Sequence, residues 1–371
     1  MTPLTSNPAD PVRQYRFVKV RGAEYHPTTA LVHWMAEGIA SLSTVTASRP
    51  DLRKSLRRAG DGLPRASIGT VPMLWAHAGI AAADRADATT VLDEIARIGF
   101  EGTQFGTGFA EGPRLRAQLS ERGLRLAEVY VPIPATADGP GADARDVCQE
   151  HLRRLHDAGG DVLCLAIDGS PDRDASAGRS DAPPTPAFTD AAWASLVGLL
   201  HEGADAAAAL GHPTVFHPHA ATFVETPTEI DRLLAATDQA RVGICLDVGH
   251  HIVGGGDPVA AIRAFGARVR HVHLKDVDGA VLQGVRAGTF PGLEDAVEAG
   301  LFTELGAGVL DLDGAIEALI ELDYDGWLMV EQDSCFGPPS ESAAIGRRVL
   351  AASLRRLGDE STKRGRREPS R

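Results

Sequence analysis

Short apolar runs recur eight times along this chain, and most of them are followed by a stretch with helical periodicity. The runs span residues 66–75, 101–105, 124–133, 161–167, 212–219, 242–250, 269–276 and 327–333. Repeated strand–helix units imply an α/β fold with a parallel sheet, and eight units imply a closed (β/α)8 TIM barrel. An open doubly wound sheet is the alternative, but it rarely reaches eight units, and no GxGxxG follows the first run. The pattern therefore predicts a barrel.

The ends of the chain differ from this pattern. A length of 371 residues favours two domains at about 150 residues each, but barrels often exceed 200 residues as one domain. We expect one catalytic barrel over residues 66–356. Residues 1–65 contain no motif and form an N-terminal extension of unassigned role. Residues 357–371 are polar and basic, which predicts a flexible, disordered tail.

Charge and composition exclude several partners. The 50 acidic residues outnumber the 37 Lys and Arg residues, and the resulting net charge of -13 would repel a nucleic-acid backbone. No apolar run approaches the ~20 residues of a membrane helix, and the N-terminus lacks the apolar core of a signal peptide. The four cysteines are widely spaced, as in proteins of a reducing compartment. We expect a cytoplasmic protein that binds neither nucleic acid nor membrane and that assembles, if at all, as a homo-oligomer.

Imidazoles, carboxylates and one lysine gather where the fifth to eighth runs end. They are His217, His219, Asp247, His250, His251, His271, His273, Lys275, Asp276, Glu331 and Asp333. The carboxyl ends of parallel strands are neighbours in a barrel, and residues two apart share a face. Mixed nitrogen and oxygen donors suit Mn²⁺, Co²⁺, Zn²⁺ or Fe²⁺. Two long insertions follow the fourth and seventh strands, on the same side as this cluster: the polar segment 169–186 and the segment 277–311.

The segments FHPH, LDVGHH, HVHLKD and VEQD, in this order and spacing, resemble the myo-inosose-2 dehydratases of the xylose isomerase-like barrel superfamily. The resemblance covers roughly residues 66–356 and is strongest over residues 214–333. It implies a divalent metal, with Mn²⁺ or Co²⁺ preferred, held by four residues. These are His217, Asp247, His273 and Glu331. His219 lies two residues after His217, on the same face of the fifth strand, and is the alternative ligand there.

The resemblance also implies a polyhydroxylated ketone as substrate, with the metal acting as a Lewis acid on its carbonyl. Removal of the adjacent proton and loss of a β-hydroxyl would make the protein a hydro-lyase of inositol and carbohydrate catabolism. Its catalytic residues would be Glu331, His250 and Lys275. We expect His77, Gln104, His219, Asp276 and Asp333 to contact the substrate. Glu128, on the third strand, could reach the substrate or fill a layer of the barrel core.

Two departures from the family pattern change residues that are expected to line the substrate pocket. Trp75 is followed by AHAGI instead of an acidic segment, and Gln104 stands where the dehydratases have a glutamate. An isomerase or epimerase of the same superfamily is the alternative function. Epimerases use opposing carboxylates on the fifth and eighth strands, and His217 here leaves only Glu331, which favours elimination. A phosphodiester-cleaving relative and a non-catalytic sugar-binding protein are weaker alternatives.

Overall fold

A computed structural model describes residues 63, 65–76, 85–181 and 185–365. Eight parallel strands close into a barrel in the order β1-β12-β9-β8-β7-β6-β3-β2. The strands are β1 (Ser67–Thr70), β2 (Gly102–Gln104), β3 (Arg125–Ile133), β6 (Val162–Ile167), β7 (Thr214–His217), β8 (Val242–Asp247), β9 (Val269–Leu274) and β12 (Trp327–Val330). Each lies within one of the eight apolar runs, so the predicted TIM barrel is confirmed.

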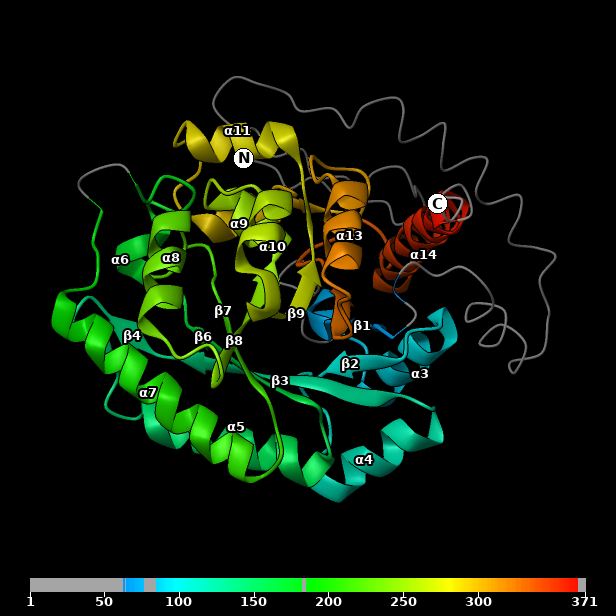
Figure 1. Ribbon diagram of the computed structural model, residues 1–371, viewed down its shortest axis with the longest axis horizontal. Helices are drawn as coiled ribbons and strands as arrows, with labels where there is room; N and C mark the ends of the chain where they lie inside the picture. The colour runs from blue at the N-terminus through cyan, green and yellow to red at the C-terminus, as the bar shows by residue number, and fades with distance from the viewer. Residues whose placement is uncertain (1–62, 64, 77–84, 182–184, 366–371) are drawn as a thin grey trace, which may run out of the picture. The chain divides into compact units, whose positions relative to one another are not determined.

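A helix follows each barrel strand, and Figure 1 shows these helices around the strands. They are α3 (Ala88–Ile98), α4 (Gly112–Glu121), α5 (Ala144–Ala158), α7 (Asp190–Ala209), α8 (Pro227–Ala236), α10 (Pro258–Phe265), α13 (Leu312–Glu321) and α14 (Pro339–Gly365). Local sequence explains where several begin. Thr226 and Glu229 form a reciprocal capping box at α8, and the side chains of Asp87, Thr189 and Asp257 accept backbone N–H groups at other helix starts.

The two predicted insertions pack together on the C-terminal side of the barrel. The first contains α6 (Pro171–Asp174), and the second contains α11 (Gly279–Arg286) and α12 (Leu293–Glu298). Strands β10 (Asp276–Val277) and β11 (Phe302–Thr303) pair antiparallel at the base of the second insertion. A separate hydrophobic cluster joins both insertions to α9 (Val248–Val253). It comprises Ala177, Ala220, Ala221, Ile252, Val253, Val277, Leu282, Val285, Leu293, Ala296, Leu301 and Phe302.

Other elements are short. The 3-10 helix η3 (Pro72–Ala76) follows β1, the hairpin of β4 (Ala135–Thr136) and β5 (Gly139–Pro140) follows β3, and η5 (Gly266–Arg268) precedes β9. In the described part of the chain, no helix combines the length and apolar character of a membrane span.

The last helix continues farther than the sequence analysis expected. Helix α14 runs to Gly365, so the predicted tail boundary at residue 357 falls inside it. Leu354 and Leu357 are buried against the main core, so packing of the helix continues up to the expected boundary. Residues 366–371 of the predicted tail lie outside the described residues, as does nearly all of the predicted extension over 1–65.

Candidate metal centre and active site

Four side chains from adjacent strands meet at the C-terminal edge of the barrel. His217 ends β7, Asp247 ends β8, His273 lies near the end of β9, and Glu331 follows β12. All four residues are buried, with exposed fractions of 7% or less. One ligand atom from each lies within 4.8 Å of the others, so the structure brings together the four residues that the family resemblance proposed as metal ligands.

The contacts of this group leave ligand atoms directed at one another. His273 Nδ1 lies 2.6 Å from Glu331 Oε2 and 3.8 Å from Asp247 Oδ2. His217 Nε2 lies 3.6 Å from the same Asp247 oxygen. Asp247 Oδ1 accepts the backbone N–H of His250, which leaves Oδ2 for another partner. These distances place two imidazole nitrogens and two carboxylate oxygens around one point.

The donor set fits a divalent metal. Asp247 Oδ2, His273 Nδ1 and Glu331 Oε2 are buried without a hydrogen-bond partner, and such atoms are costly in a protein interior. Burial alone would raise the pKa of Asp247 and Glu331, but Lys275 and the neighbouring imidazoles hold both pKa values below their usual range. Two imidazoles with two ionised carboxylates match Mn²⁺, Co²⁺, Zn²⁺ or Fe²⁺.

Lys275 lies beside this group and is almost fully buried. Its Nζ is 3.0 Å from Glu331 Oε1, 2.9 Å from Asp333 Oδ1 and 2.9 Å from His250 Nε2. Burial works against its charge, but Asp247, Asp333 and Glu331 raise the pKa of Lys275 above its ordinary value. The ammonium group therefore stays protonated at neutral pH.

His250 and Asp333 complete the surroundings of Lys275. Burial, together with the nearby His219 and Lys275, holds the pKa of His250 well below its ordinary value, so its imidazole is neutral. Burial raises the pKa of Asp333 to about 6. The Asp333 side chain is 12% exposed, so it is the most accessible of the three charged groups Lys275, Glu331 and Asp333.

The structure separates His219 from the ligand group. The strand ends at His217, so the two-residue alternation does not carry His219 to the same place. Its Nδ1 is 2.7 Å from the Ala220 carbonyl oxygen, and its ring stacks on His250 with centroids 3.6 Å apart. Burial lowers the pKa of His219 to about 3. These contacts favour His217 as the ligand on β7 and leave His219 beside a predicted catalytic residue.

The remaining predicted substrate contacts have different environments. Asp276 is fully buried, and its carboxylate accepts the backbone N–H groups of Gly306, Gly308, Leu310 and Val277. These hydrogen bonds fix the backbone of the second insertion. They also satisfy the buried Asp276 carboxylate without any contact to a substrate. Gln104 ends β2 and is partly exposed. His77 lies outside the described residues.

The structure places Glu128, which the sequence left between a substrate contact and a barrel-core layer, in the core beneath the ligand group. Glu128 of β3 places Oε1 2.9 Å from His273 Nε2 and Oε2 3.2 Å from His271 Nε2. The imidazoles overcome the effect of burial and hold the pKa of Glu128 well below its ordinary value. An acid in the middle of an otherwise apolar strand was the only signal in the sequence, and it could not reveal the partners.

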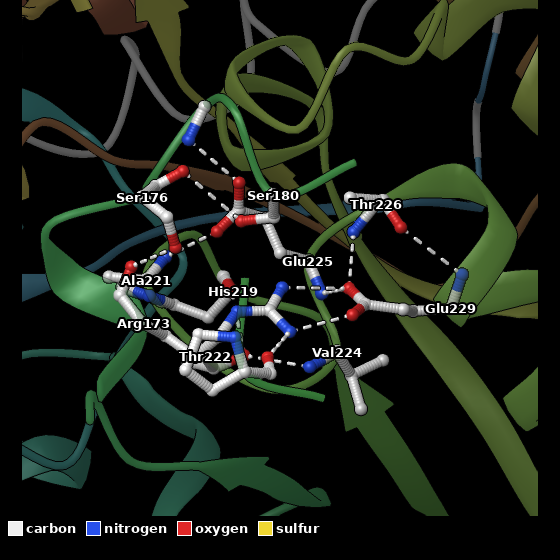
Figure 2. A network of polar contacts seen from close by, with 12 residues as sticks. Arg173, Ser176, Ser180, His219, Ala221, Thr222, Val224, Glu225, Thr226 and Glu229 are labelled. Atoms are coloured by element: carbon white, nitrogen blue, oxygen red, sulfur yellow. Dashed lines mark hydrogen bonds and ion pairs between the residues drawn. The ribbon is translucent and has the colours of Figure 1, made fainter. Parts of the chain in front are cut away.

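A polar network attaches the first insertion to the loop before α8 (Figure 2). Arg173 is fully buried and donates to both carboxylate oxygens of Glu229, at 2.7 and 3.0 Å. Glu225 is also buried and accepts the backbone N–H groups of Gly178 and Ala221, at 2.7 and 2.8 Å. Buried polar side chains on both segments therefore anchor the insertion over residues 169–186.

Glu225→Gln should reduce the pH dependence of folding stability. Burial raises the pKa of Glu225 to about 7, whereas an unfolded glutamate titrates near 4.3. Between these values the native state keeps a proton that the unfolded state has lost, so the native protein loses stability as pH rises. The loss reaches about 3 kcal/mol across this interval. Urea unfolding between pH 4.5 and 7.5 should show a flatter profile in the variant, whereas exposed Glu294→Gln should retain the wild-type slope.

Comparisons with known proteins agree with this architecture. A family model described as xylose isomerase-like TIM barrel matches residues 92–353. Inosose dehydratase from Geobacillus kaustophilus (strain HTA426) is 33% identical over 288 residues, covering 76% of this chain and 93% of the relative. Inosose dehydratase from Lacticaseibacillus casei is 31% identical over 266 residues, with 71% and 88% covered. A solved L-ribulose 3-epimerase superposes with a TM-score of 0.62 at 17% identity, covering 82% of this chain and all of that one.

The closed barrel, with imidazoles and carboxylates at its C-terminal edge, has the architecture of a (β/α)8 enzyme. The chain belongs to the xylose isomerase-like TIM barrel family. Within that family it is an inosose dehydratase-like member, because dehydratase homologues match it over most of their length. The predicted family resemblance is thereby confirmed.

Proposed function

We propose that this protein is a metal-dependent hydro-lyase that removes water from inosose or a closely related keto-sugar. The observation that carries the proposal is the convergence of His217, Asp247, His273 and Glu331 within 4.8 Å, beside a buried Lys275. Two inosose dehydratases at 31–33% identity support the substrate class. A metal held by these four residues would supply Lewis-acid chemistry at a substrate carbonyl.

The side chains divide the proton transfers between them. Glu331 is an ionised carboxylate at the edge of the group, which suits it to accept the proton next to the carbonyl. Lys275 is a buried cation that can donate a hydrogen bond to the departing hydroxyl and supply its proton. Neutral His250, 2.9 Å from Lys275 Nζ, contacts the ammonium group and orients it. Asp333 holds the other side of the ammonium group.

An epimerase remains the second candidate because a solved L-ribulose 3-epimerase shares this fold. Epimerisation requires proton exchange on both faces of one carbon. In this site a carboxylate follows β12, whereas β7 contributes the His217 imidazole. This one-sided arrangement supports elimination, in which proton removal and hydroxyl loss use different groups.

The test is a metal-reconstituted assay with Mn²⁺ or Co²⁺ on scyllo-inosose and a small panel of keto-sugars. Ultraviolet absorbance reports an enone or diketone product, and deuterium uptake from solvent reports proton exchange. Metal-dependent absorbance on scyllo-inosose is the expected result. Deuterium uptake or epimer formation without water loss would contradict the hydro-lyase activity and favour the epimerase activity.

Lys275→Met should slow turnover without weakening metal binding. Removal of a general acid typically costs 10²–10⁴-fold, so we expect kcat to fall by about 10²-fold. Because Lys275 Nζ contacts Glu331 and lies 3.5 Å from Asp247, its removal also takes away a cation that competes for both carboxylates. Mn²⁺ affinity, measured by calorimetry, should stay equal or rise. A variant that loses metal affinity together with activity would contradict the assigned role.

A further inference from the structure

The barrel core beneath the ligand group contains an acid and an imidazole in place of aliphatic side chains. Glu128 and His271 are both completely buried. His271 lies two residues before His273 on β9, so both imidazoles face the barrel interior. Interior layers of such barrels are usually filled by branched aliphatic residues. A buried carboxylate destabilises the core unless its partners compensate its charge.

The two oxygens of Glu128 are used by different imidazoles. Oε1 lies 2.9 Å from His273 Nε2, and Oε2 lies 3.2 Å from His271 Nε2. An ionised carboxylate only accepts hydrogen bonds, so each facing nitrogen must carry a proton. A neutral His273 protonated at Nε2 has its lone pair on Nδ1. That nitrogen is directed toward Asp247 and Glu331.

We propose that Glu128 and His271 form a positioning pair that fixes the tautomer and ring orientation of the metal ligand His273. Glu128 holds the proton of His273 on Nε2 and directs Nδ1 into the metal centre. His271 donates to the second oxygen and prevents the carboxylate from rotating away. This role rests on the metal centre of the proposed function, but not on the identity of the substrate.

The barrel topology explains why a second group is needed. Strand register places His273 beside Asp247 on β8 and Met329 on β12, which fixes the position of its backbone. A half turn of the ring about its last side-chain torsion would still put Cδ2 in the place of Nδ1 and Cε1 in the place of Nε2, which turns both nitrogens away from their partners. Glu128 comes from β3, which is not adjacent to β9 in the barrel, so its contact crosses the interior and selects one orientation.

The same residues also allow a different interpretation, in which Glu128, His271 and His273 bind a second cation. The two interpretations predict different stoichiometries. A positioning pair requires one metal per chain and an N–H proton between His273 and Glu128. A second metal site requires two metals per chain and no proton there.

The experiment compares Glu128→Gln with the wild-type chain by Co²⁺ titration and by proton NMR of the Co²⁺-loaded protein. Loss of a partner of this kind typically weakens metal binding 10–100-fold, and we expect a decrease in that range at one Co²⁺ per chain. The hyperfine-shifted N–H resonance of His273 should move and exchange faster with solvent. Leu200→Met changes the shape of a fully buried residue on α7, outside the barrel strands, and should leave both readouts unchanged.

A second variant covers the case in which Glu128→Gln does not fold. His271→Gln keeps an N–H donor for Glu128 Oε2 and should retain most of the affinity, whereas His271→Phe should weaken Co²⁺ binding. Unchanged affinity and an unchanged N–H resonance in Glu128→Gln would overturn the pair, as would two Co²⁺ ions per wild-type chain. Both readouts need no substrate, so a failed dehydration assay would leave the positioning pair standing.

Discussion

Glu331→Gln should abolish most of the activity, with kcat reduced about 10³-fold at saturating metal. The change removes a negative charge that lies 2.6 Å from His273 Nδ1 and 3.0 Å from Lys275 Nζ. The amide can neither accept the substrate proton nor neutralise the metal charge as a carboxylate does. Turnover of scyllo-inosose and Mn²⁺ affinity should therefore both fall, in contrast to the behaviour expected of Lys275→Met.

The matched control is Glu298→Gln, which makes the same chemical change at the exposed end of α12. It should retain full activity and metal affinity. If Glu331→Gln kept more than about a tenth of wild-type turnover at saturating metal, its role as the proton acceptor would be rejected, because loss of a general base typically costs at least 10²-fold.

Arg173→Met should destabilise the fold by about 3 kcal/mol. The guanidinium group is fully buried and makes a bidentate contact with Glu229, whose side chain is only 17% exposed. Removing one partner leaves a largely buried carboxylate without its compensating charge. Chemical denaturation followed by circular dichroism should measure the loss.

The double variant Arg173→Met, Glu229→Gln should recover part of the stability, because it leaves no unpaired charge. Arg263→Met provides the control. Its bidentate contact with Glu321 resembles that of Arg173, but both side chains are about half exposed, so the loss of stability should be much smaller than in Arg173→Met. Equal losses in Arg173→Met and Arg263→Met would show that burial of the first pair has no energetic consequence.

Sequence periodicity was sufficient for the barrel because each strand is a short apolar run and each is followed by a helix. Periodicity also predicted that polar side chains at the strand ends would gather at one edge, since strand ends meet there whatever the loops between them do. The choice of individual metal ligands among those side chains came from the family resemblance. His219 shows the limit of the rule that residues two apart on a strand share a face. The alternation holds only while the strand continues, and β7 ends at His217.

The contacts that the sequence could not reveal join segments at irregular separations. Glu128 meets His271 and His273 across the closed barrel, and Arg173 meets a glutamate 56 residues away. No period or motif encodes such distances, because they depend on which strands face each other after closure. Asp276 was predicted to contact the substrate because it follows a strand. Its carboxylate instead accepts hydrogen bonds from four backbone N–H groups of the insertion that it precedes.

The place of Glu331 in the chain has a consequence for the order of assembly. Glu331 follows β12, the last strand of the barrel, and reaches the other three ligands when β12 pairs with β9. All four ligands also come from the C-terminal half of the chain, and during synthesis the last of them leaves the ribosome after most of the barrel is available. The complete site therefore exists only after the last strand of the barrel has joined β9. Metal ions in the cell would then bind the finished barrel in preference to its intermediates and slow its reopening, which makes metal supply a determinant of how long each newly made molecule survives.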